Sequence, residues 1–321
     1  MQDNQYIVNF KNQFTKKFRE QVIPIIKDMD TERENLLTKN EALKKKIYII
    51  AAVIIFAIFM YEFIVEHCIS IMNNGYIFTV GGAIALTKGL KYVAKKSFEK
   101  SIKQKIMPVL MSAFGDFQWT TSCTISQDEI KKSKLFKYYE RYETDDNFSG
   151  SYRGVNVRIA EAELTYTVDS SKGERTVVEF DGVLISINIP KSIVGHTMVL
   201  DKKDKRQQFL SEYKEVKLED VEFSKMFNVY STDQVESRYL LTTAFMERFK
   251  NIRNVFGGDL ISCSFLDKTL LIAIPVDKDM FSLGDLDVSI LDTEQYNVFL
   301  NEIISIFELI EELKLYQNTG L

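Results

Sequence analysis

Residues 47–60 form an apolar run without a charged side chain, and Lys44, Lys45 and Lys46 come directly before it. A helix that is apolar on every side has no face for water, so protein core or lipid must surround it. Extended to Val65, the run has about 19 residues and roughly 28 Å of helix, close to the roughly 30 Å of a bilayer core. We therefore expect a membrane-spanning helix, with Glu62 as its one costly residue.

The flanks of this run indicate a hairpin with a defined orientation. A second, shorter apolar stretch covers residues 76–86, and the connection 66–75 contains no Lys or Arg. Lysines follow the second stretch at once, namely Lys88, Lys91, Lys95, Lys96 and Lys100. Because positive residues gather on the cytoplasmic side, we expect both termini and the main domain in the cytoplasm. The turn between the two helices fits Asn73-Asn74-Gly75 or a place nearer His67. The alternative to a membrane hairpin is a helical hairpin buried in a large soluble core.

The two parts of the chain carry opposite net charge. Residues 1–115 have 17 basic and 10 acidic side chains, whereas residues 116–321 have 24 and 35. The basic part suits anionic lipid headgroups, and the acidic part argues against nucleic acid as a partner. The three cysteines and two histidines lack the spacing of zinc ligands or of a disulfide framework. We therefore expect no metal site and no cofactor.

Amphipathic helices are expected on both sides of the hairpin. Apolar residues lie mostly four apart in residues 5–43, with Pro24 as a kink or break, and residues 88–114 form a second such stripe. We expect the stripes to pair, although both helices could lie along the bilayer. The predicted plan is a cytoplasmic amphipathic helix (1–46), a transmembrane helical hairpin (47–87), a basic amphipathic helix (88–115), a cytoplasmic α+β domain (116–290) and an acidic amphipathic helix (291–321).

The pattern changes to that of a sheet after residue 116. Residues 154–168 alternate between apolar and polar, a turn follows, and residues 176–189 are rich in Val, Ile and Phe, as in a hairpin of long strands. Asp181-Gly182 is either a tight turn between shorter strands or a bulge in one long strand. We also predict strands at 196–200, 259–265 and 269–275, and helices at 232–249, with Ser231 as N-cap, and at 293–315. This order predicts an α+β domain with a mainly antiparallel sheet.

The last predicted helix is apolar on one side and acidic on the rest. The basic helix after the hairpin complements it, so we expect residues 293–315 to pack against a stalk formed by 5–43 and 88–114. Packing on the sheet is the alternative.

Several separated blocks carry a family resemblance. They include Phe148-x-Gly-x-Tyr-Arg-Gly154, Phe180-x-Gly-Val-Leu184 and a long block at 227–241. Over roughly residues 85–285 the chain resembles the bacterial membrane proteins grouped as domain of unknown function 3137. The resemblance implies two membrane helices before a cytoplasmic domain, and a multi-pass protein of the bacterial cell membrane. It implies no activity.

Two groups of residues form a candidate interaction surface. Glu161 and Glu163 share one face of a strand, where they would either act together on a proton or cation, or simply form the wet face of a sheet. Arg153 and Arg158 are positioned in sequence to neutralise them. Arg238 and Tyr239 follow a predicted helix start capped by Asp233, and a binding role competes there with a packing role for Tyr239.

Catalytic signatures are missing from the sequence. His196 has no histidine or cysteine companion and is expected to be a hydrogen-bonded structural residue. Ser97-x-x-Lys100 lies in a lysine-rich helix without companion motifs, and no phosphate-binding loop, zinc-protease motif or nucleophile elbow occurs. We therefore name no catalytic residue and favour a protein that is not an enzyme.

Three functions fit these observations. The first is a membrane-anchored cytoplasmic interaction or scaffold module that binds a membrane-protein partner. The second is an envelope-maintenance protein whose basic helix contacts anionic lipids. The third is an enzyme without a recognisable local motif.

Overall fold

The computed structural model describes residues 2–65, 69–170, 173–204, 212–277, 280–281, 286–292 and 294–312. The chain divides into two compact units. The sheet unit consists of Met1–Phe18, Pro108–Phe281 and Glu294–Leu321. The helical unit consists of Arg19–Met107 and Ser282–Thr293.

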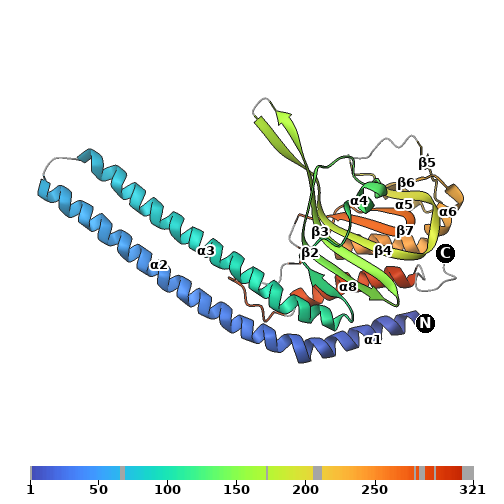
Figure 1. Cartoon of the computed structure of the whole chain (residues 1–321), viewed down its shortest axis with the longest axis horizontal. Coiled ribbons are helices and arrows are strands. Elements are labelled where there is room, and N and C mark those ends of the chain that lie inside the picture. The colour runs from blue at the N-terminus through green and yellow to red at the C-terminus, as the bar shows by residue number, and fades with distance from the viewer. Residues whose placement is uncertain are drawn as a thin grey trace. The chain divides into compact units, whose positions relative to one another are not determined.

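Two long antiparallel helices make up most of the helical unit (Figure 1). Helix α2 spans Ile23–Val65 and helix α3 spans Ile69–Ala113. The last residues of α3, from Pro108 on, belong to the sheet unit. Residues 73–75 are helical, so the turn does not fall at Asn73-Asn74-Gly75, and the alternative place near His67 lies outside the described residues. The predicted helices 1–46 and 88–115 are not separate elements, because each continues without a break into the predicted hairpin.

The N-terminal helix is interrupted where the sequence places Pro24. Helix α1, Gln2–Lys17, is followed by a π-helical segment, Phe18–Val22, and α2 starts one residue before Pro24. Proline has no N–H to donate and its ring displaces the carbonyl four residues back, so regular helical bonding fails there. The predicted kink or break is thus a change of helix type.

The predicted apolar stripes are buried in part, since Leu90 and Val93 of the second stripe are exposed. Val22, Ile26 and Met29 of the first stripe are almost inaccessible, as are Phe98 and Ile102 of the second. An ion pair between Lys105 Nζ and Glu32 Oε2, 3.0 Å apart, links α3 to α2. Pairing of the stripes, rather than two helices along a bilayer, agrees with this burial.

In the described part of the chain, no helix has a stretch both long and apolar enough to cross a membrane. The predicted transmembrane hairpin at 47–87 is therefore not supported by these residues. The side chains of residues 62–77, which belong to that prediction, lie outside the described part.

The sheet unit confirms the predicted antiparallel sheet. Its described strands are β1 Gln118–Thr120, β2 Arg141–Tyr152, β3 Val155–Ser170, β4 Gly173–Asp201, β5 Lys214–Glu215, β6 Phe227–Ser231 and β7 Ser262–Pro275. They pair antiparallel in the order β1-β2-β3-β4-β6-β5, and β7 pairs with the other side of β4. The shorter helices are α4 Gln127–Ser133, α5 Val221–Met226, α6 Gln234–Leu240 and α7 Thr243–Val255, and α8 spans Glu294–Glu312.

Strand β4 is longer than predicted, because Asp181-Gly182 is not a turn. The strand runs on through the predicted separate strand 196–200. The register with β3 shifts at Glu179, two residues before Asp181, so Glu179 is the bulge residue. Gly182 lies so close to the backbone of β7 that a Cβ would sit 2.2 Å from the Ile274 carbonyl oxygen. Strand β7 likewise joins the two predicted strands 259–265 and 269–275.

The predicted helix 232–249 is two helices. The Asp233 carboxylate accepts hydrogen bonds from the backbone N–H groups of Val235 (2.9 Å) and Glu236 (3.0 Å) and caps α6. Thr242 caps α7 through the Phe245 N–H. Ser231, predicted as the N-cap, lies in β6 instead. The second cap starts a new helix, because a capping residue has extended backbone angles that end the preceding one.

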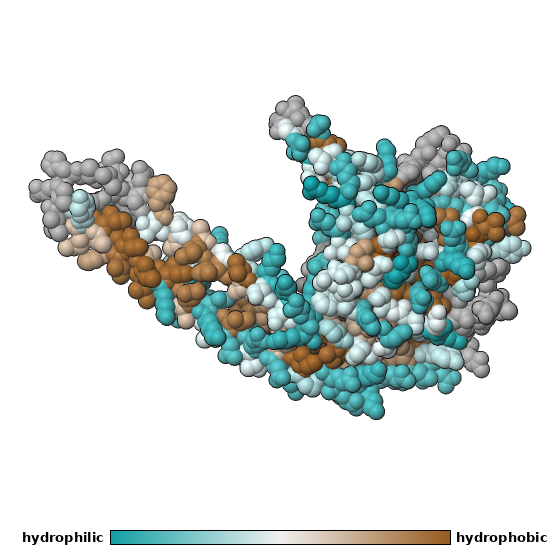
Figure 2. Space-filling view, viewed as in Figure 1, coloured by the Kyte–Doolittle hydropathy of each residue, from teal (hydrophilic) through white to brown (hydrophobic). Residues whose placement is uncertain are grey.

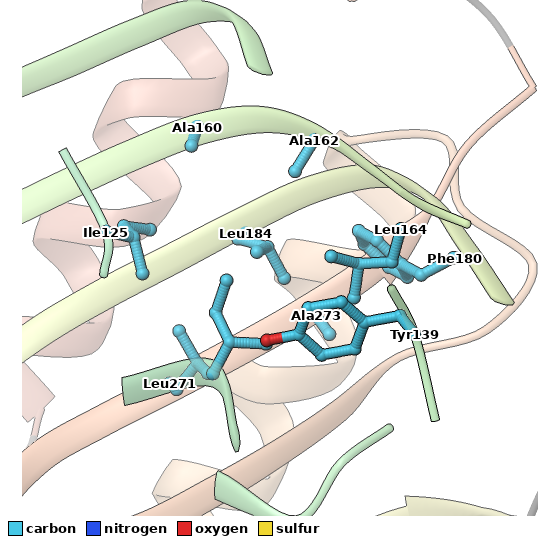
Figure 3. Close-up of a cluster of buried hydrophobic side chains, with 10 residues drawn as sticks. Ile125, Tyr139, Ala160, Ala162, Leu164, Phe180, Leu184, Leu271 and Ala273 are labelled. Atoms are coloured by element: carbon cyan, nitrogen blue, oxygen red, sulfur yellow. The ribbon is translucent and has the colours of Figure 1, made fainter. Parts of the chain in front are cut away.

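Apolar side chains cover both faces of the sheet. On one face, Ala160, Ala162 and Leu164 of β3 lie with side chains of β4 and β7 against Ile125 and Tyr139 (Figure 3). On the other face, α8 places Phe299 5.6 Å from Phe148 and Phe307 4.1 Å from Tyr152, measured between ring centroids.

Helix α8 also contacts the ends of the predicted stalk. Phe307 lies 4.9 Å from Phe10 of α1, and Phe299 lies 5.5 Å from Phe114, just after α3. Packing on the sheet and packing on these stalk residues therefore occur together. Residues 313–315 of the predicted helix lie outside the described part.

Candidate functional site

Arg153 holds α8 to the sheet. It forms, with Gly154, the two-residue turn between β2 and β3, and both residues have positive φ, 52° and 80°. Arg153 Nη1 lies 2.8 and 2.7 Å from the two carboxylate oxygens of Glu311, and the Tyr152 hydroxyl donates to the same carboxylate at 2.8 Å. The guanidinium also lies 4.1 Å from the ring centroid of Tyr6. Sequence reasoning missed this role, because Glu311 is far away in the chain.

The two glutamates that we singled out on β3 share a face, as predicted. Glu163 is exposed, whereas Glu161 is half-buried and accepts a hydrogen bond from the Met280 N–H at 3.1 Å. The neighbouring arginine, Arg158, pairs with Glu129 of α4 at 2.9 Å. Arg153 therefore pairs with Glu311 of α8, and Arg158 pairs with Glu129 of α4.

Further carboxylates gather around Glu163. Glu143 of β2, Glu163 and Asp181 of β4 stand opposite one another on three adjacent strands. Together with Asp145 and Asp277 they line a hollow of about 390 Å³. Burial, with the nearby charge of Asp277, raises the pKa of Asp181 above its ordinary value. Among the described residues, no group of His, Cys, Asp and Glu is arranged to hold a metal ion.

Arg238 and Tyr239 lie on the outer side of α6. Tyr239 is 70% exposed and Val235, one turn earlier, is 63% exposed. Val194 on β4 is 90% exposed and its N–H donates to Glu236 of α6 at 2.9 Å. We call Val194, Val235, Arg238 and Tyr239 the α6 patch. A cavity of about 740 Å³, lined by Arg238 and by residues 217–220 and 241–243, adjoins it.

The α6 patch stands on a firmly held helix. The Asp233 cap fixes its start, and the Glu236 carboxylate accepts from the N–H groups of Val194 and Gly195 at 2.9 and 2.7 Å. A Cβ at Gly195 would lie 2.8 Å from Asp233 Cβ, so only glycine lets β4 approach α6 this closely. The side chain of Tyr239 is mostly exposed, which argues against the packing alternative and leaves the binding role as a prediction.

The helical unit exposes a large apolar surface, visible as brown along α2 and α3 in Figure 2. Monomeric soluble proteins rarely leave large contiguous apolar patches open to water. We call it the apolar band; its members on α2 are Tyr48, Ile49, Ile50, Val53, Ile54, Phe56, Phe59, Met60 and Tyr61, and those on α3 are Phe78, Val80, Ile84, Leu86, Leu90, Tyr92 and Val93.

The predicted membrane-proximal lysines lie on α3 beside the apolar band. Lys91 Nζ is 2.9 Å from Asp287 Oδ2, and Lys95 Nζ is 4.0 Å from Glu99 Oε1. Lys88, Lys96 and Lys100 are exposed.

His196 is a buried, hydrogen-bonded residue, as the sequence predicts. Its Nε2 lies 2.8 Å from Ser264 Oγ and its Nδ1 lies 2.7 Å from the Tyr213 hydroxyl. Burial lowers its pKa to about 4, so the ring is neutral at neutral pH. Ser264 is only 1% exposed, so a substrate cannot reach its hydroxyl. In a catalytic triad the histidine is oriented by a carboxylate, whereas here the second partner of His196 is the phenol of Tyr213. This geometry favours a structural role.

Comparison with known proteins gives limited similarity. No curated protein matches the chain. The crystal structure of the mycobacterial trehalose monomycolate transport factor A, TtfA, is similar at a TM-score of 0.37 and 12% identity, over 63% of this chain and 90% of that chain. We expected the family resemblance over roughly residues 85–285. Residues 178–315 match the model of the family described as protein of unknown function (DUF3137), which supports a domain of unknown function in that part of the chain.

Proposed function

We propose that this protein is a membrane-anchored interaction module of the bacterial cell envelope. The apolar end of the α2–α3 hairpin enters the membrane, and the sheet unit presents the α6 patch to a membrane-protein partner. Both termini and the sheet unit face the cytoplasm. The observation that carries the proposal is the apolar band.

The exposure of the apolar band supports insertion into lipid. Ile50, Val53 and Phe56 are 58–63% exposed on a helix that has no polar face in this stretch. Water contact with so many side chains costs free energy that burial in lipid would recover, at about 25 cal/mol per Å². Lysines before the band on α2 and after it on α3 then lie where anionic headgroups are found.

Flotation with phosphatidylcholine vesicles, followed by an alkaline carbonate wash, tests the anchor. The full chain should stay with the vesicles, and Ile50→Lys with Val53→Lys should release it, since each lysine at a helix centre costs about 2.5–3.5 kcal/mol of insertion. Val168→Lys with Val178→Lys is the matched control, because both valines are exposed on the sheet unit. Wild-type protein that washes off, or a charged band variant that stays bound, would refute the anchor.

Single cysteines test the orientation. In a variant without Cys68, Cys123 and Cys263, an impermeant thiol reagent added to intact cells should label a cysteine at position 73 and miss one at position 320. The same reagent should label position 320 only after lysis. Labelling of position 320 in intact cells would place the sheet unit on the other side of the membrane.

The α6 patch is proposed as the partner surface because it combines exposed apolar side chains with an arginine on a rigid helix. Interface anchors are enriched in tyrosine and arginine. A photoreactive residue in place of Tyr239 should give a defined adduct with one membrane protein in cells, and Arg238→Glu should remove it. The matched control is the same replacement at Tyr138, which is 55% exposed. Equal adducts from both positions would rule out the patch.

A further inference from the structure

A groove in the helical unit combines the chemistry of a headgroup with that of an acyl chain. It has a volume of about 310 Å³ and lies between α2 and α3. Tyr48 and Ile84 belong both to its lining and to the apolar band, so the groove opens at the edge of the surface proposed to enter the membrane. Leu43, Ile47 and Leu90 extend its apolar wall.

The polar side of the groove is positively charged. Lys44, Lys88 and Lys91 line it, together with the two carboxylates of Glu41 and Asp287. Lys44 Nζ lies 3.5 Å from Glu41 Oε1, and Lys91 Nζ lies 2.9 Å from Asp287 Oδ2. Within the described residues, Lys88 has no carboxylate partner. One lysine is therefore left to meet an anion at the level of the expected membrane surface.

A second observation points to a ligand at the same place. Asn40 also lines the groove, and its side-chain Nδ2 is buried without a hydrogen-bond partner among the described residues. A buried amide donor without an acceptor costs about 1–3 kcal/mol, so native proteins rarely keep one unless something accepts from it. A bound phosphate that pairs with Lys88 would accept from this donor once the Asn40 side chain turns toward the groove.

We propose that this groove is a binding site for the phosphate headgroup of an anionic glycerophospholipid, with the acyl chains lying along the apolar band. The inference rests on the proposed membrane anchor and assigns to it a lipid class. Lys88 supplies the charge, Asn40 supplies a hydrogen bond, and Tyr48 and Ile84 contact the start of the chains. A free phosphate ion carries the same anionic group as the lipid headgroup. The apolar wall of the groove favours the lipid, because a free ion has no acyl chain to contact it.

The test titrates short-chain phosphatidylglycerol into the full chain in neutral detergent and measures the dissociation constant. Lys88→Gln should weaken binding about fivefold, the loss of one lysine contact near an anionic surface. Lys39→Gln is the matched control: it removes the same charge one residue from Asn40, at an exposed position outside the groove, and should change binding less than about twofold. Equal affinities of wild type, Lys88→Gln and Lys39→Gln would overturn the site.

Asn40→Leu separates a binding role from a structural one. Replacement of an unpaired buried amide should leave the lipid-free unfolding temperature unchanged or higher, and should still weaken phosphatidylglycerol binding. A variant that loses stability without lipid, with unchanged affinity, would show that Asn40 is only structural and would count against the site.

Two further measurements complete the test. A competition experiment distinguishes lipid binding from binding of a free anion, and flotation distinguishes failure of the groove from failure of the membrane anchor. Short-chain phosphatidylcholine should bind more weakly than phosphatidylglycerol, and equimolar glycerol 1-phosphate or inorganic phosphate should fail to displace the lipid. Displacement by either small anion would overturn the lipid in favour of a free phosphate. Flotation on phosphatidylcholine vesicles reports the anchor separately, so a flat titration with intact flotation refutes the groove alone.

Discussion

The contact between Arg153 and Glu311 predicts a large loss of stability from one substitution. Glu311 is only 6% exposed and its carboxylate accepts two contacts from Arg153 and one from Tyr152. Arg153→Met removes the positive charge and leaves the carboxylate with the phenol alone. Because an uncompensated buried charge is strongly unfavourable, we expect a loss of about 3 kcal/mol in the free energy of unfolding.

Trp119 gives the assay. It is the single tryptophan of the chain, and its Nε1 donates to Asp146 at 2.6 Å within the same unit. At an m-value of about 2–3 kcal/mol per molar urea, 3 kcal/mol moves the fluorescence midpoint down by about 1–1.5 M. The positive φ at position 153 is strained for arginine and methionine alike, so this strain cancels in the comparison.

The double variant isolates the pair. Arg153→Met with Glu311→Leu should recover about 2 kcal/mol relative to Arg153→Met alone, because the stranded carboxylate is gone. If Arg153→Met lowers the free energy of unfolding by less than about 0.5 kcal/mol, Arg153 does not hold α8 to the sheet. That result would favour the expectation from the sequence that Arg153 belongs to an interaction surface.

Three other predictions follow from the sheet unit. Asp233→Ala should cost about 1 kcal/mol through the lost α6 cap, whereas Gln234→Ala should be nearly neutral, and equal effects in urea unfolding would contradict the cap. Burial lowers the pKa of His196 from 6.5 to about 4, so between these pH values the unfolded chain binds a proton that the folded chain does not. The free energy of unfolding should therefore fall as the pH is lowered from about 6.5 to 4, and His196→Gln should reduce this fall. Glu161→Gln with Glu163→Gln should change stability by less than about 0.5 kcal/mol, and a lost cation affinity or activity in the folded double variant would favour an enzyme.

Local pattern was sufficient for several elements. Alternation in residues 154–168 predicted β3, since successive side chains of a strand point to opposite faces. Asp233 was recognised as a cap because a carboxylate before a helix meets free N–H groups within three residues. The shorter elements α4, α5, β1 and β6 were missed, since short segments have too few residues for a period.

The candidate sites depended on contacts between distant residues. Arg153 meets Glu311 across 158 positions, and His196 meets Ser264 across 68. The α6 patch needed the break between α6 and α7 and the approach of Val194 to Glu236, neither of which has a periodic signal.

The sequence by itself determined the long helices α2, α3 and α8, the strand β3, the apolar character of residues 47–60 and the lysines beside it, because these follow from neighbours in the chain. Only the tertiary structure decided which charges pair, which face of α8 meets the sheet and the ends of α1 and α3, and where Asn40 and Lys88 come together in one groove. The physical reason is range. Propensity and periodicity act over a few residues, whereas ion pairs and cavities form between surfaces that the fold brings together.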